Sequence, residues 1–296
     1  FVCRPDDFAY YAERIAKEDL PQQEAPLHLA MQRWQQACDL QPQPDLDAQW
    51  RTRVAYYGMC AHLDRQIGAV LAALEDAGEL ANTIIVYTSD HGEMLGDHGL
   101  WWKSTFYDGA AKVPFILSWP GHAPEGRAVS ANASLIDIGE TLCALAGIAG
   151  LPKASGRDLR PLLQGDMAPT WDDTIWTELA RAGGPPQAVG PARMVRSGPW
   201  KYNFYYNDRP ELFNVVEDPE ERHDRWDDPD CREVLEEMHI KCLDSWSPLD
   251  VQRRLAWTRE ELKLCGKWVD KVQPPNADPL WFGDADPENR VDPVEQ

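Results

Sequence analysis

The chain has 296 residues and a formal net charge of −20, from 49 acidic and 29 basic side chains. This length suffices for one large or two modest domains with a sizeable core. Because binding to a nucleic-acid backbone requires an excess of Lys and Arg, the charge balance argues against nucleic acid as the main partner. No apolar run approaches the roughly 18 to 20 residues that span a bilayer, so we expect a soluble chain with no membrane partner.

The seven cysteines show no CxxC spacing, and their odd number leaves at least one without a disulfide partner. This usage fits a reducing compartment, so we predict a cytoplasmic location. The chain starts at Phe1 rather than Met, and its first residues lack the basic, apolar and small-residue regions of a signal peptide. We therefore expect that these residues begin inside a longer protein.

The first half of the chain predicts helices that lead into an α/β sheet. Residues 1–48, rich in Pro, Gln and Asp, predict loops with one or two short helices. Apolar residues at helical spacing over 50–77 predict an amphipathic helix that Gly78 ends. The β-branched and aromatic run at 83–88 predicts a strand buried on both faces, and 113–119 predicts a second short strand.

The second half of the chain predicts a helix, then a strand and a hairpin, and then another helix. A helix is expected from Ser134, whose hydroxyl can cap it, to Gly147. Thr174 to Leu179 predicts a strand, and 192–206 predicts a hairpin around a Ser-Gly-Pro turn. The pattern of 231–246 is helical.

Turn signals near residue 165 mark a change of unit. We predict an α/β domain at 1–165 with a mixed, mostly parallel sheet between helices, and a small antiparallel α+β subdomain at 166–250. Residues 251–296 are predicted to form a C-terminal tail. Exposed aromatic residues often mark interfaces, so the tryptophans of this tail suggest a contact that could join copies of the chain in a homo-oligomer.

The first strand is followed directly by chemically active side chains. Open α/β sheets place their ligand crevices at the carboxyl ends of strands, where Asp90 and His91 fall. A carboxylate oxygen and an imidazole nitrogen can share one divalent cation. The alternative is an Asp that caps a turn beside a surface His.

Two further side chains follow in the same segment. The Lys103 ammonium can neutralise charge that develops on a transferring sulfuryl or phosphoryl group, the alternative being an exposed surface lysine. His98 has a pKa suited to donating a proton to a leaving group, and it could also orient the substrate. The alternative for His98 is a hydrogen bond that only supports neighbouring groups.

These residues carry a resemblance to a known family. The run SDHGEMLGDHGLWWK, followed by YDGAAKVPFI, resembles the C-terminal metal and anion segment of the sulfatase family, within the alkaline phosphatase superfamily. Other segments occur in the order that this family shows, including SLIDIGETLCALAGI, GRDLRPLLQG, MVRSGPWKYNFYY and ELFNVVEDPEE. The match covers most of residues 50 to 225.

The resemblance implies an alkaline phosphatase-like fold and metal-dependent hydrolysis of a small-molecule sulfate monoester. Asp90 and His91 match family ligands of one divalent cation. Ca²⁺ is favoured, with Mn²⁺ and Mg²⁺ open because histidine is less typical of a pure calcium site. Lys103 matches the lysine that contacts the sulfate ester. The family's nucleophile is a formylglycine made from the cysteine of a C-x-P-x-R motif, and this nucleophile lies well upstream of the metal segment.

Cys3-Arg4-Pro5 imitates the start of that motif, but Asp7 stands where the arginine belongs. We therefore expect the nucleophile to come from a region N-terminal to Phe1. The nearest alternative is a phosphonate monoester or phosphodiester hydrolase of the same superfamily. A non-catalytic sulfatase-like fragment is a third possibility, favoured because a family histidine is missing from the Pro5 to Phe8 stretch.

Overall fold

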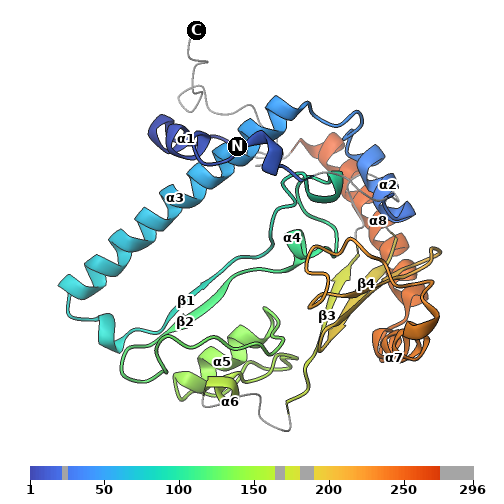
Figure 1. Cartoon of the computed structure of the whole chain (residues 1–296). Helices are drawn as coiled ribbons and strands as arrows, with labels where there is room; N and C mark the ends of the chain where they lie inside the picture. Colours follow the sequence, from blue (N-terminus) through green and yellow to red (C-terminus); the bar gives the residue numbers. More distant parts are fainter. Residues whose placement is uncertain (22–25, 164–170, 181–189, 274–296) are drawn as a thin grey trace.

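The computed structural model describes residues 1–21, 26–163, 171–180 and 190–273 (Figure 1). The first part is helical, as predicted, and α1 lies along the much longer α3. Pro5 opens α1, a position where its missing N–H costs no hydrogen bond. The elements of this part are α1 (Pro5–Ala12), η1 (Lys17–Asp19), α2 (Leu29–Ala37), α3 (Leu46–Asp76) and η2 (Leu80–Asn82).

The long helix α3 begins at Leu46, before the predicted amphipathic helix at 50–77, and ends at Asp76, with Ala77 as its C-terminal cap. The Asp45 carboxylate caps it by accepting a hydrogen bond from the Ala48 amide at 2.8 Å. Gly78 follows the helix with φ +72°, as its predicted role in ending the helix requires. Only Val54, Ala55 and Gly58 of α3 are fully buried, so most of its apolar face is only partly covered.

The predicted mixed, mostly parallel sheet is not confirmed by the described residues, whose strands pair antiparallel. β1 (Ile85–Thr88) pairs antiparallel with β2 (Phe115–Ser118). The connection over 89–114 is long enough for the crossover of a parallel pair, which is usually a helix, but it contains only the short elements η3 (Asp97–Gly99) and α4 (Asp108–Ala111). The residues of β1 are half-buried rather than fully covered on both faces.

The helix predicted from Ser134 begins three residues later, as α5 (Asp137–Leu145), and α6 (Arg160–Leu163) follows it. The Ser134 hydroxyl is predicted to cap the helix, but the hydrogen bond seen here comes from the other residue's side chain. The buried Asp137 carboxylate accepts from the Ser134 amide at 2.9 Å. It also accepts from the Arg157 amide at 2.8 Å and pairs with its guanidinium at 3.1 Å. Asp137 thus ties α5 to the segment that leads into α6.

The second sheet is antiparallel with the order β3-β4-β5-β6, as the predicted subdomain requires. Gly198, with φ +54°, turns the predicted hairpin between β4 and β5. Helix α7 packs on these two strands and buries a core that includes Tyr202 and Met238. The elements are β3 (Thr174–Leu179), β4 (Ala192–Ser197), β5 (Trp200–Tyr205), β6 (Glu211–Asn214), η4 (Pro229–Cys231) and α7 (Arg232–Leu243).

A second core joins distant parts of the sequence. The connection between β1 and β2 contributes Met94 and Phe106, α2 contributes Trp34, and the C-terminal sheet contributes Tyr205 and Phe213. All five side chains are buried. The connection that carries the predicted site is therefore a packed segment held between α2 and the C-terminal sheet.

The predicted tail at 251–296 begins as a regular helix, because 251–272 belong to α8 (Pro248–Val272). None of the residues of α8 is fully buried, and Trp257 and Trp268 are exposed. The rest of the predicted tail, 274–296, and the predicted boundary at 165 lie outside the described residues. No helix within the described ranges is long and apolar enough to cross a membrane.

Candidate active site

Three of the four predicted site residues meet just after β1. The Nδ1 atom of His91 lies 2.7 Å from the Gly92 carbonyl oxygen. A carbonyl only accepts hydrogen bonds, so Nδ1 carries the proton and Nε2 presents a lone pair. That Nε2 lies 2.5 Å from Lys103 Nζ and 3.4 Å from Asp90 Oδ2. The structure therefore brings Asp90, His91 and Lys103 together.

This arrangement fits half of a metal site. The Asp90 carboxylate and the His91 lone pair are one oxygen and one nitrogen donor, and the Gly92 carbonyl holds the imidazole in the tautomer that a cation needs. The Asp90 side chain is 83% exposed, which leaves room for further ligands. Within the described ranges, no group of three or more His, Cys, Asp or Glu side chains could hold a metal ion. Any cation bound here would need ligands from elsewhere as well.

Gly92 is required by a close approach of two backbone segments. Its amide donates to the Ala110 carbonyl at 2.8 Å, and an added Cβ would lie 2.1 Å from the Gly109 carbonyl oxygen. No side chain fits at that distance, so only glycine allows the residue after His91 to pack on the start of α4. Sequence reasoning noted Gly92 as part of a motif but missed this structural role.

We expect Gly92→Ala to destabilise the protein by about 1 to 3 kcal/mol, the usual cost of forcing extra atoms into a packed site. Chemical denaturation in urea measures this free energy. Gly68→Ala is the matched control, because nothing lies within 4 Å of a Cβ added at that position of α3. In a helix interior this control should stabilise by about 0.5 to 1 kcal/mol. Equal effects of the two substitutions would contradict the close approach.

The turn that carries Lys103 has an unusual backbone. Trp102 and Ser104, on either side of it, have φ values of +65° and +77°, and Leu95 has a φ of +48°. Such left-handed conformations cost energy for residues other than glycine and persist where the surroundings impose them. The Glu93 carboxylate is one such constraint, since its Oε1 accepts from the Trp102 amide at 2.6 Å and the Leu95 amide at 3.2 Å.

Glu93 was missed by sequence reasoning, because a loop carboxylate two residues after His91 has no distinctive pattern. The N-terminal helical part holds the same turn from outside. Gln35 and Gln43 each donate to the Gly99 carbonyl at 2.8 Å. Arg53 of α3 donates to the Leu95 carbonyl at 2.8 Å. The position of Lys103 therefore depends on several parts of the chain.

His98 makes its contacts toward the C-terminal sheet. Its ring stacks on Tyr107 with centroids 4.1 Å apart and planes 7° apart, and Nε2 donates to the Glu220 carbonyl at 3.0 Å. Burial lowers the pKa of His98, which favours a neutral ring. These contacts favour the supporting role over direct chemistry, and proton donation by His98 stays a prediction.

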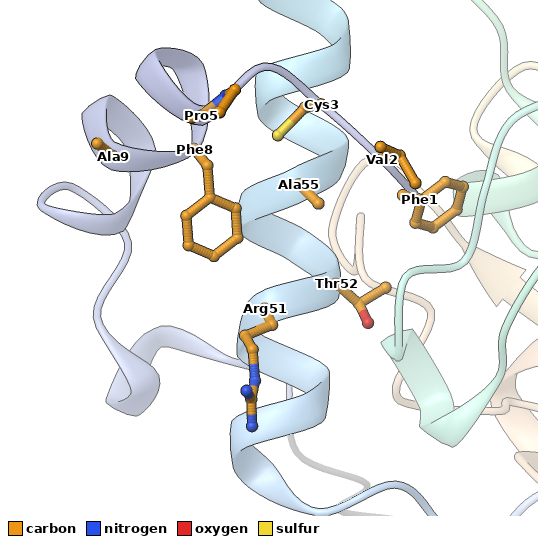
Figure 2. Close-up of a pocket in the computed structure, with 9 residues that line it drawn as sticks. All are labelled: Phe1, Val2, Cys3, Pro5, Phe8, Ala9, Arg51, Thr52 and Ala55. Carbon is orange, nitrogen blue, oxygen red and sulfur yellow. The ribbon is translucent and has the colours of Figure 1, made fainter. Parts of the chain in front are cut away.

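Cys3 lines a hollow of about 460 Å³ between the N-terminal segment and α3 (Figure 2). None of the four predicted site residues lines it. The Cys3 sulfur packs against Gly58, where an added Cβ would lie 2.8 Å from Sγ. Burial, with a smaller contribution from the Asp7 carboxylate, raises the pKa of the Cys3 thiol. A thiol with a raised pKa is a poor nucleophile, so the structure favours a packing role.

Two family models match the chain. The model described as "Sulfatase" matches residues 5–148, and the model described as "N-sulphoglucosamine sulphohydrolase, C-terminal" matches residues 96–246. The second match alone spans half of the chain, and the two together include the predicted site and both sheets.

Characterised relatives agree with these models. The chain is 35% identical over 184 residues to arylsulfatase K of Gallus gallus, with 58% of this chain and 33% of the relative covered. It is 34% identical over 172 residues to choline-sulfatase of Rhizobium meliloti, with 57% and 32% covered. The chain thus spans about a third of the length of the curated relatives it matches.

Solved structures share the fold. The phosphonate monoester hydrolase of Agrobacterium radiobacter matches with a TM-score of 0.64 and 25% identity, covering 82% of this chain and 53% of that chain. A protein described as a putative sulfatase from Bacteroides thetaiotaomicron matches with a TM-score of 0.63 and 24% identity, covering 82% and 56%. The fold of the matched part of this chain is therefore similar to that of about half of each of these proteins.

Proposed function

The chain belongs to the sulfatase family, and we propose that it forms part of a hydrolase that cleaves small-molecule sulfate monoesters with the help of a divalent cation. The observation that carries this proposal is the meeting of Asp90, His91 and Lys103 at the end of β1. Two metal donors and one ammonium at this place suit a substrate whose anionic group must be held and neutralised.

In this proposal Asp90 and His91 supply two ligands of one divalent cation. Ca²⁺ is favoured by the family resemblance, and Mn²⁺ or Mg²⁺ is the alternative, because a histidine ligand is less typical of a pure calcium site. When bound, the cation would polarise an ester oxygen. The Gly92 carbonyl keeps the proton on Nδ1 of His91, so that Nε2 keeps an unprotonated lone pair. Lys103 Nζ contacts this lone pair at 2.5 Å and would have to move away from it when the cation binds. Lys103 would bind the charged oxygens of the ester and neutralise charge that develops on them.

The attacking group belongs, in this proposal, to a region of the full-length protein outside these residues, as a formylglycine hydrate. The short coverage of the curated relatives supports this assignment. We further propose that the protein works in the cytoplasm, where the buried thiols of Cys143, Cys231 and Cys242 would stay reduced.

A phosphonate monoester hydrolase is the second candidate function. The likeness to the enzyme of Agrobacterium radiobacter supports it, since the two chains share 25% identity over the matched region. Both reactions need a cation and a positive side chain near a tetrahedral anionic centre, which the same residues could supply. Turnover of an aryl sulfate compared with that of a phenylphosphonate ester separates the two functions.

We expect Asp90→Ala to lower sulfate release from an aryl sulfate by the full-length protein at least about 100-fold, because a catalytic cation contributes several kcal/mol. Calorimetric titration with Ca²⁺ and Mn²⁺ should show weaker binding in the same variant. Asp64→Ala, which removes an exposed carboxylate from α3, is the matched control and should match the parental protein. Sulfate release at the parental rate in Asp90→Ala would refute the metal assignment.

A further inference from the structure

The segment that follows Lys103 is fixed to the C-terminal sheet by two buried polar clusters. We call the first the glutamate cluster, formed by Tyr107, Asn203, Tyr205 and Glu211. The Glu211 carboxylate accepts at Oε1 from the Tyr107 hydroxyl at 2.9 Å. At Oε2 it accepts from the Tyr205 hydroxyl at 2.9 Å and the Asn203 amide at 3.2 Å. Burial raises the pKa of Glu211, so the carboxylate depends on these donors to offset its lost hydration.

The second, which we call the lysine cluster, consists of Asp108, Lys201 and Glu221. The Lys201 side chain is 1% exposed, and its Nζ lies 2.6 Å from Asp108 Oδ1 and 2.7 Å from Glu221 Oε1. The Asp108 amide also donates to Glu221 Oε2 at 2.5 Å. Burial acts to raise the pKa of Asp108, but the adjacent Lys201 outweighs it and holds this pKa below its ordinary value.

Both clusters contact the same short segment. Tyr107 and Asp108 are consecutive at the start of α4, and they lie four and five residues beyond Lys103. The His98 ring stacks on Tyr107 and donates to the carbonyl of Glu220, which precedes Glu221 of the lysine cluster. The turn from His98 to Asp108 is thus attached at both ends to the C-terminal sheet and the loop after it.

Directional contacts of this kind fix a position more narrowly than apolar packing does. A buried hydrogen-bonded network is satisfied in one arrangement only, and a partly satisfied one is costly. A displacement of about 1 Å at a reacting centre can cost about 100-fold in rate. Lys103 lies between the two attachments, on a strained turn whose backbone would relax if they were released.

We propose that Glu211, Lys201 and Glu221 of the C-terminal part are positioning residues, which hold the turn bearing Lys103 against His91 through Tyr107 and Asp108. This inference rests on the proposed function for its catalytic consequence. It assigns to the C-terminal part an indirect role in the site, because its residues position the turn and none of them is expected to touch the substrate.

The chain offers a matched pair of variants for the test. Tyr107 and Tyr205 donate to the same carboxylate at the same distance, but Tyr107 lies on the turn segment and Tyr205 lies on β5. Tyr107→Phe and Tyr205→Phe each remove one hydroxyl and keep the ring, so they leave the His98 stacking partner in place. Only the first of them breaks a contact between the turn and the sheet.

Hydrogen exchange of backbone amides in the 296-residue chain gives a readout without activity. We expect exchange over residues 96–106 to be about tenfold faster in Tyr107→Phe, with β4 protected as in the parental chain. Tyr205→Phe should leave 96–106 unchanged. In the full-length protein, Tyr107→Phe should lower kcat for an aryl sulfate about tenfold with little change in KM, because the lysine acts mainly as charge develops.

Unchanged exchange at 96–106 in Tyr107→Phe, or an equal rise in both variants, would overturn the proposal whatever the rates of turnover. Faster exchange in Tyr107→Phe with an unchanged kcat would also overturn it, because the turn would then move without consequence for Lys103. A parental full-length protein that releases no sulfate would refute the proposed function instead, and the exchange result would still decide whether the C-terminal part positions the turn.

Discussion

Lys103→Ala is expected to lower kcat/KM for aryl sulfate hydrolysis by the full-length protein about 100- to 1,000-fold, the range for removal of one preorganised group that stabilises charge in a transition state. The structural reason is the position of its ammonium, 2.5 Å from Nε2 of His91 and hence beside the proposed metal donors. Initial rates over a range of substrate concentrations measure this loss.

Cation affinity should distinguish Lys103→Ala from Asp90→Ala. The ammonium lies on the lone pair of His91 that a metal would use, and its charge repels a cation. Its removal should therefore leave Ca²⁺ or Mn²⁺ affinity unchanged or tighter, whereas Asp90→Ala weakens it. Lys112→Ala is the control, since it removes the same charge from an exposed position near the other end of the connection. Parental activity in Lys103→Ala, or an equal loss in the control, would contradict the assignment.

Lys201→Met is expected to destabilise the protein by about 3 to 5 kcal/mol, the cost of leaving a buried charge without its partner. The substitution removes the ammonium from between Asp108 and Glu221 while keeping an unbranched apolar side chain. Urea unfolding at pH 7 measures the difference. Lys112→Met is the matched control, because Lys112 Nζ also lies near Asp108, at 3.8 Å, but its side chain is 71% exposed. Exposed pairs of this kind contribute about 0 to 1 kcal/mol.

The loss of stability caused by Lys201→Met should be smaller at acidic pH than at pH 7. Lys201 holds the pKa of Asp108 below its ordinary value, so this carboxylate stabilises the parental fold above about pH 4 and the contribution is lost as pH falls through the lowered pKa. Burial raises the pKa of Glu221, and Lys201 opposes that rise. In the variant both carboxylates take up protons at higher pH, which removes the unpaired charge. A deficit that is the same at pH 7 and pH 4, or one shared by Lys112→Met, would show that this ion pairing is unimportant.

Residues close together in the sequence determined much of what could be predicted. The helical spacing of 50–77, the apolar run of β1 and the Ser-Gly-Pro turn between β4 and β5 are local patterns, and the corresponding elements form. Asp90 and His91 could be placed together because they are neighbours at a strand end. Lys103 reaches them because twelve residues of tight turns bring the chain back.

Residues distant in the sequence decided the rest. The antiparallel pairing of β1 with β2 depends on how the connection folds back, which periodicity within a strand does not report. Glu93 became recognisable as a support only through its hydrogen bonds to Leu95 and Trp102. The contacts that favour a supporting role for His98 also include a partner 122 residues away, the Glu220 carbonyl.

By itself, the sequence determined the long helix α3, the strands β1 to β5, the family and the group of side chains proposed to bind a cation and an anion, but it did not predict helix α8. Only the tertiary structure decided that Tyr107 and Asp108 would meet Glu211, Lys201 and Glu221 across about 100 residues of chain. The physical reason is that propensity, periodicity and turn chemistry act over a few residues, whereas a buried charge finds its partner only after the chain has folded.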